Sequence, residues 1–200
     1  AAGSEAAFAV LATQISAATA GLVWMMQDIK STGKASMLGI ATGAVGGLAT
    51  ITPAAGSVGP AGALCIGGLA GVICRWFSTT VKDKFGYDDS LDVFGVHGIG
   101  GFLGTCVLGI FGNKLFGGFV TTPMVRQTLI QCGAALGTAA YTAVASWLCL
   151  KIVRKICGGL RVPDDAEAGE GLDKWCHGES CYTLEEDGGT VDGQPPTAIA

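Results

Sequence analysis

The stretch from Ala35 to Cys74, which contains no Asp, Glu, Lys or Arg, constrains the fold of this chain more than any other feature. As one helix it would be about 60 Å long, roughly twice the ~30 Å hydrocarbon thickness of a bilayer. It therefore has to fold back on itself, and the segment 52–60, with two prolines and two glycines, marks the break. Half of the 200 residues are hydrophobic and only 14% are charged, which is too little charge to cover a soluble domain. These properties predict an all-α membrane protein.

Other uncharged stretches extend this prediction to five membrane helices, at about 6–27, 35–53, 61–81, 92–112 and 127–152. Residues 1–162 hold eleven Lys and Arg against six Asp and Glu, whereas residues 163–200 hold one Lys against ten acids. We therefore expect a transmembrane region over residues 1–158. We expect an acidic, largely extended C-terminal tail over residues 159–200.

Basic residues collect on one side of the expected helices, which is typical of loops that face the cytoplasm. That side holds ten of them, namely Lys30, Lys34, Arg75, Lys82, Lys84, Lys151, Arg154, Lys155, Arg161 and Lys174. The opposite side holds only Lys114 and Arg126. We therefore expect a multi-pass protein of the plasma membrane with residue 1 outside and a cytoplasmic C-terminus. The chain starts without a basic region or a cleavage pattern, so we expect no signal peptide and interpret the sequence as part of a larger protein.

Small residues recur every four positions in several of the expected helices. They are Gly39, Gly43 and Gly47, then Ala63, Gly67 and Gly71, and finally Gly100 with Gly104. Such stripes let helix backbones approach closely in lipid, where packing rather than hydrophobicity drives association. We expect a tightly packed bundle.

His97 is the one histidine inside an expected membrane helix. Ionisable groups within a membrane are rare and usually face a pathway or a partner, and an imidazole can both accept and donate a proton. We therefore favour a functional role over a histidine that merely packs in the core. Asp92 opens the same helix, where it is expected to be the N-cap.

Other classes of function find no support in the sequence. His177 lies between Cys176 and Cys181, but this spacing fits no standard zinc site, so we expect no metal and no cofactor. The eight cysteines suggest no disulfide framework, because five lie in or beside apolar helices. The sequence contains no hydrolase, metalloprotease or phosphate-binding motif, so we expect no enzyme. The only dense charge cluster is acidic, which excludes nucleic-acid binding.

Three motifs resemble those of the ammonium transporters, the Amt/Mep/Rh superfamily. The first is DVFGVHG at 92–98, and the second is ITPAAGSVG at 51–59. The third is GLRVP at 159–163, followed in the tail by Gly171, Leu172, Asp173, His177, Gly178, Glu179 and Tyr182. The residues around the helix histidine resemble the Amt/Mep branch more than the Rhesus proteins. The resemblance fades beyond Tyr182.

The resemblance implies the second half of an eleven-helix fold, in which two inverted halves assemble into a homotrimer with one pore per subunit. His97 would be the second of two pore histidines that relay protons. Ser4 would hydrogen-bond the recruited cation, and Asp92, Val93 and Thr52 would be pore-associated. The tail residues would form a regulatory segment that couples subunits and is open to a PII-type protein or a kinase.

The function that the resemblance implies is ammonium transport: ammonium is recruited and deprotonated, and ammonia and a proton pass through a histidine-lined apolar pore. The alternative is an ammonium sensor, or transceptor, that signals through its C-terminal tail. A third possibility is a membrane fragment without activity of its own.

Overall fold

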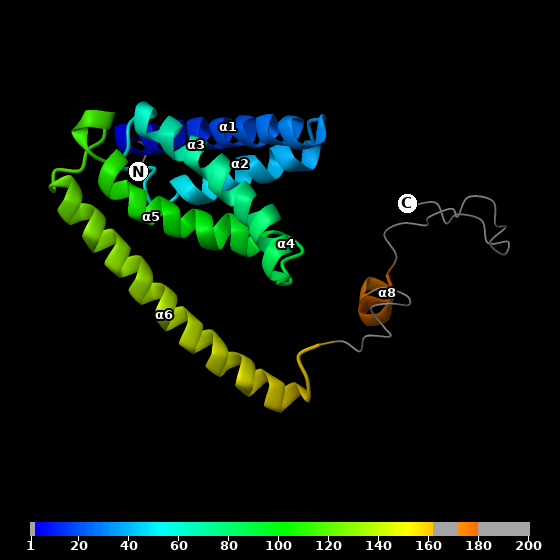
Figure 1. Ribbon diagram of the computed structural model, residues 1–200. Coiled ribbons are helices and arrows are strands. Elements are labelled where there is room, and N and C mark those ends of the chain that lie inside the picture. Colours follow the sequence, from blue (N-terminus) through cyan, green and yellow to red (C-terminus); the bar gives the residue numbers. More distant parts are fainter. Residues whose placement is uncertain (1–2, 162–171, 180–200) are drawn as a thin grey trace. The chain divides into compact units, whose positions relative to one another are not determined.

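The computed structural model describes residues 3–161 and 172–179, and among these residues it contains helices and no β-strand (Figure 1). The α-helices are α1 (Ser4–Thr32), α2 (Met37–Ile51), α3 (Pro60–Trp76), α4 (Lys82–Phe85), α5 (Ile99–Phe111), α6 (Met124–Cys157) and α8 (Leu172–His177). Two π-helical segments, η1 (Phe77–Val81) and η2 (Phe94–Gly98), and a short 3-10 turn, η3 (Lys114–Phe116), complete them. The chain divides into two compact units, 1–142 and 143–200. The prediction of an all-α protein is confirmed.

Four helical segments of the described residues are long and apolar enough to cross a bilayer. They are Ser4–Thr32, Pro60–Phe85, Phe94–Phe111 and Met124–Cys157. Each of them overlaps one of the predicted ranges, while the crossing itself stays a prediction.

The second predicted range, 35–53, holds a shorter helix than expected. There α2 has 15 residues, or about 22 Å, less than the ~30 Å hydrocarbon thickness of a bilayer. Its start is set by the Ser36 side chain, which accepts a hydrogen bond from the Gly39 N–H at 3.1 Å. Its end follows from Pro53, which has no backbone N–H to continue the helical hydrogen bonds. The next N–H, that of Ala54, donates to the Ile51 carbonyl at 2.8 Å in a tighter turn. The helix in this range is therefore two residues shorter at each end than the expected 35–53, and its crossing of the membrane stays a prediction.

The predicted glycine stripes of α2 and α3 both face α1, which lies beside these two helices (Figure 1). A Cβ on Gly47 would lie 2.5 Å from the Ser16 carbonyl oxygen, and one on Gly67 would lie 2.6 Å from the same atom. Ser16 is completely buried there and donates a hydrogen bond to the Gly47 carbonyl at 3.0 Å. The three backbones can approach this closely only because neither glycine has a side chain.

Helix α5 packs on α2 and α3 through its own small residues. A Cβ on Gly100 would lie 2.8 Å from the Thr50 hydroxyl, and one on Gly104 would collide with the Thr50 carbonyl. The largest side chains that are completely buried in the bundle are Ile51, Ile66 and Val58. The core is thus built mainly of small and medium side chains, as the glycine content predicts.

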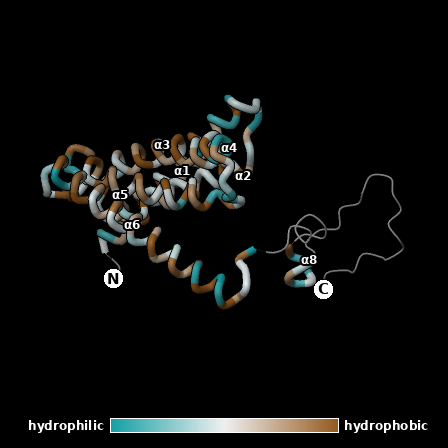
Figure 2. Tube along the Cα trace, turned by 60° about the horizontal axis from the view of Figure 1, so that its bottom comes forward, coloured by the Kyte–Doolittle hydropathy of each residue, from teal (hydrophilic) through white to brown (hydrophobic). Residues whose placement is uncertain are grey.

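The outer faces of the helices stay apolar. Figure 2 shows hydrophobic segments along α3 and α5. Leu38 is 77% exposed and Val10 is 71% exposed, and many other large hydrophobic side chains are also exposed. Exposed apolar area of this extent indicates surfaces that lie against lipid or further protein.

Candidate functional site

The candidate proton-relay residue, His97, lies in the π-helical segment η2, directly before α5. Its side chain is exposed and makes no hydrogen bond or ion pair with the described residues. Its neighbours Gly95 and Val96 are buried. Single π-helical turns within α-helices occur frequently at functional sites. The local structure therefore turns one side of η2 into the bundle and leaves the imidazole on the open side.

The buried side of η2 packs against the second π-helical segment, η1. Gly95 lies so close to Ser78 that a Cβ on the glycine would collide with the serine hydroxyl. The rings of Phe77 and Phe94 meet edge to face, with their centroids 6.5 Å apart. The Ser78 hydroxyl is buried and has no hydrogen-bond partner among the described residues. Two irregular helix segments thus fit each other at the position of the histidine.

A small polar cluster lies one turn further along the same interface. The Cys74 thiol lies 4.0 Å from the Val96 carbonyl oxygen, to which it donates, and 3.9 Å from the Thr50 hydroxyl. That hydroxyl donates to the Gly46 carbonyl at 2.8 Å. Since Val96 directly precedes His97, these contacts hold the backbone that carries the imidazole.

Asp92 does not cap the helix that it precedes, so the expectation of an N-cap at this residue is wrong. The cap is Asp89, whose carboxylate accepts hydrogen bonds from the backbone N–H groups of Val93 at 2.8 Å and Phe94 at 3.0 Å. Asp92 has a left-handed backbone, with φ 55°, and its carboxylate forms an ion pair with Lys82 at 2.8 Å instead. The turn of the chain brings Asp89 back over the free N–H groups and directs Asp92 to the lysine.

The remaining predicted pore residues lie on open surfaces. Ser4 is exposed at the first turn of α1, and Val93 is 52% exposed. Thr52 follows α2, and its hydroxyl donates to the Leu48 carbonyl at 2.7 Å. These side chains therefore remain accessible to a ligand or to further protein.

Ser4 and His97 are not brought together. Near the start of α1, the Phe8 ring lies 5.3 Å from the ring of Phe119, which follows the end of α5. His97 precedes the start of α5, near Asp92. The two candidate residues thus lie towards opposite ends of the bundle.

The tail residues are partly described. Leu172, Asp173 and His177 belong to α8, and Gly178 and Glu179 follow it in exposed positions. The N–H of Gly178 donates to the Lys174 carbonyl at 3.0 Å and closes the helix. Gly171 and Tyr182 lie outside the described residues. Among the residues that are described, no group of three or more His, Cys, Asp and Glu side chains could hold a metal ion.

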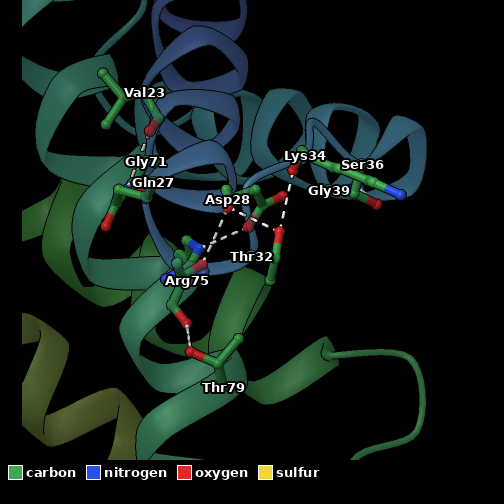
Figure 3. Close-up of polar contacts among 11 residues, drawn as sticks. Val23, Gln27, Asp28, Thr32, Lys34, Ser36, Gly39, Gly71, Arg75 and Thr79 are labelled. Carbon is green, nitrogen blue, oxygen red and sulfur yellow. Dashed lines mark hydrogen bonds and ion pairs between the residues drawn. The ribbon is translucent and has the colours of Figure 1, made fainter.

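An ion pair that sequence reasoning missed joins the ends of α1 and α3 (Figure 3). Arg75 Nε lies 2.9 Å from Asp28 Oδ1, and Arg75 Nη2 donates to the Ser31 hydroxyl at 2.8 Å. Gln27 Nε2 adds a hydrogen bond to the Gly71 carbonyl at 2.9 Å. The sequence did contain a signal, because Asp28 directly follows the first expected helix and Arg75 lies in the last third of the third one. The chain reverses twice between α1 and α3, so these two helices run parallel and their C-terminal ends lie at the same side of the bundle.

The sequence matches the model of the Ammonium Transporter Family over residues 1–182. It is similar to an ammonium transporter of Aquifex aeolicus, with 39% identity over 188 residues, which cover 92% of this chain and 43% of the relative. The ammonium transporter Amt1 of Archaeoglobus fulgidus is 40% identical over 186 residues, which cover 92% of this chain and 46% of that protein. The chain thus spans less than half the length of these curated relatives.

Solved structures with this fold include Mep2 of Candida albicans, with a TM-score of 0.70 and 31% identity over 81% of this chain and 38% of that chain. A structure described as a sensor Amt protein has a TM-score of 0.77 at 22% identity, and it covers 88% of this chain and 43% of its own. At that identity the likeness concerns the fold alone.

Proposed function

The chain belongs to the ammonium transporter family, and from this membership we propose that the protein transports ammonium across the plasma membrane. The match over residues 1–182 carries the proposal. The position of His97 supports it, since the imidazole lies within an apolar helical segment and is engaged by none of the described residues.

The proposed mechanism separates the proton from the ammonium ion. A bare ion is very costly to move through hydrocarbon, whereas neutral ammonia is not. Ammonium is recruited near Ser4 and deprotonated, ammonia then passes an apolar pore that includes Val93 and Thr52, and the proton passes through His97. Potassium has no proton to lose, so this route excludes it.

Asp92 has a supporting role in this mechanism, at the cytoplasmic end of the pore. Its carboxylate is paired with Lys82 at 2.8 Å, and the lysine also donates to the Asp89 carbonyl at 2.9 Å. This pair stabilises the turn that leads into η2 and thereby the backbone that carries His97.

The proposed assembly is a homotrimer in which the tail of one subunit contacts its neighbour. The exposed apolar faces of the helices support burial against further protein and lipid. The tail, with Asp173, His177 and Glu179 exposed, is proposed as the contact site for a PII-type regulator or a kinase.

The proposal is tested by measuring ammonium-driven current in the purified protein, reconstituted into liposomes on a solid-supported membrane. We expect a saturable transient current after an ammonium jump and none after a potassium jump of the same size. Protein-free liposomes are the control. Ammonium binding without any current would instead identify the alternative function, a sensor that signals through its tail.

The orientation leads to a separate prediction. In intact cells, a membrane-impermeant thiol reagent is expected to leave Cys176 and Cys181 unmodified, since ten of twelve basic residues mark their side as cytoplasmic. Mass spectrometry of the peptides that contain these cysteines measures the modification. Permeabilised cells, in which both should react, are the control. Modification from outside the intact cell would reverse the orientation.

A further inference from the structure

The C-terminal end of α6 carries a group of exposed basic side chains. They are Lys151, Arg154 and Lys155, and Arg161 follows shortly after the helix end. Trp147, one turn before Lys151, is also exposed, and the lysine Nζ lies 4.0 Å from the centre of its indole ring. We call Trp147, Lys151, Arg154 and Lys155 the basic face of α6.

The basic face lies on one side of the helix. At about 100° per residue, its four members fall within a stripe roughly 100° wide. The opposite side at the same level carries only uncharged residues, including Cys149, Ile152 and Ile156. The cationic groups therefore point in one common direction instead of surrounding the helix, which is the arrangement that a single anionic surface requires.

The length of α6 places the basic face at a membrane surface. From Arg126 to Trp147 the helix rises about 32 Å, close to the ~30 Å thickness of the hydrocarbon core. With Arg126 at one interface, Trp147 lies at the other, where indole rings concentrate. The basic side chains then follow at about 6 to 12 Å beyond Trp147, which is the depth of the lipid phosphates.

The positive charge of this face is not neutralised by neighbouring carboxylates. The sequence contains no Asp or Glu between Asp92 and Asp164. Among the described residues, Arg154 and Lys155 form no ion pair, and the indole of Trp147 attracts the Lys151 ammonium without cancelling its charge. The face therefore retains three positive charges for an external anion.

We propose that the basic face of α6 binds the headgroups of anionic phospholipids in the adjoining leaflet. The ligand is a phosphodiester with net negative charge, such as phosphatidylglycerol, rather than zwitterionic phosphatidylcholine. Basic clusters that directly follow a membrane helix bind anionic lipid through such charge complementarity. The depth of Trp147 favours a lipid phosphate over a dissolved one, because the indole lies at the interface where lipid phosphates concentrate.

Native mass spectrometry of the purified protein, titrated with phosphatidylglycerol or phosphatidylcholine, tests the proposal. The variant Lys151→Gln/Arg154→Gln/Lys155→Gln is compared with a control of equal charge loss, Lys30→Gln/Lys34→Gln/Lys84→Gln, whose lysines are exposed elsewhere. We expect the first variant to bind phosphatidylglycerol at least about tenfold more weakly, since each basic residue near such a surface contributes about fivefold. The control lysines lie on the same expected side but do not share one helix face, so we expect the control to weaken binding clearly less than the first variant does. The charge-preserving variant Lys151→Arg/Arg154→Lys/Lys155→Arg should bind like the parent protein.

Several outcomes would overturn the lipid site. If both charge-loss variants lost the same affinity for phosphatidylglycerol, the effect would depend on net charge alone. If the α6 variant lost the same affinity for phosphatidylglycerol and phosphatidylcholine, the substitutions would have damaged the protein in general. Displacement of the lipid by millimolar inorganic phosphate would identify a soluble anion as the ligand. Binding of phosphatidylglycerol only after Glu185, Glu186 and Asp187 have been changed to amides would identify the acidic tail of this chain as the occupant.

Discussion

Replacing His97 by leucine is expected to abolish ammonium-driven current while the protein still folds and assembles. Leucine is of similar size but can neither hydrogen-bond ammonia nor carry a proton. The imidazole makes no hydrogen bond to the described residues, and the contacts that hold η2 come from Gly95 and Val96. The substitution should therefore leave the packing on the buried side of η2 unchanged. Solid-supported-membrane current and the thermal unfolding midpoint of the same preparation measure both effects.

The matched variant is His97→Glu, which keeps a polar group that can coordinate a cation directly. We expect it to lose selectivity and to conduct potassium, which the parent protein excludes. A histidine that only packs or orients the helix would give the reverse pattern, with leucine tolerated and glutamate misfolded. Ammonium currents of parental size in a well-assembled His97→Leu protein would refute the proton relay.

Replacing Gly67 by alanine is expected to destabilise the protein, by about 1 to 3 kcal/mol or more, through overpacking. The new methyl group would lie 2.6 Å from the Ser16 carbonyl oxygen and 2.9 Å from the Ser16 Cα. Both are backbone atoms, so no side-chain rotation relieves the collision and α1 has to move away from α3. The unfolding midpoint in detergent, followed by fluorescence-detected size-exclusion chromatography, measures the loss.

The adjacent glycine is the matched control. A Cβ on Gly68 would meet nothing within 4 Å, and alanine is preferred over glycine within a helix by about 1 kcal/mol. Gly68→Ala is therefore expected to leave the midpoint unchanged or to raise it. If the two variants behaved alike, the close approach of α3 to Ser16 would not limit the stability of the bundle.

Local properties of the sequence were sufficient for much of the fold. The uncharged stretches located the helices, because a helix in lipid satisfies its own backbone hydrogen bonds and its position depends mainly on hydrophobic length. The glycine spacing predicted close helix contacts. The partner of those contacts could not be read, since a stripe shows which face is small but not which helix lies against it. Only the structure assigns the stripes of Gly47 and Gly67 to the same residue, Ser16.

The candidate site divides in the same way. The sequence by itself determined that His97 is the one titratable histidine in an apolar helix, and the surrounding motif determined the family. Tertiary structure alone decided which acid caps that helix, because Asp89 and Asp92 are chemically equal and only the path of the chain distinguishes them. It also decided that Ser78 and Cys74 contact Gly95 and Val96, the two residues before the histidine. The ion pair between Arg75 and Asp28 likewise follows only from the tertiary structure. Such pairings depend on contacts between residues distant in sequence, which local residue patterns do not encode.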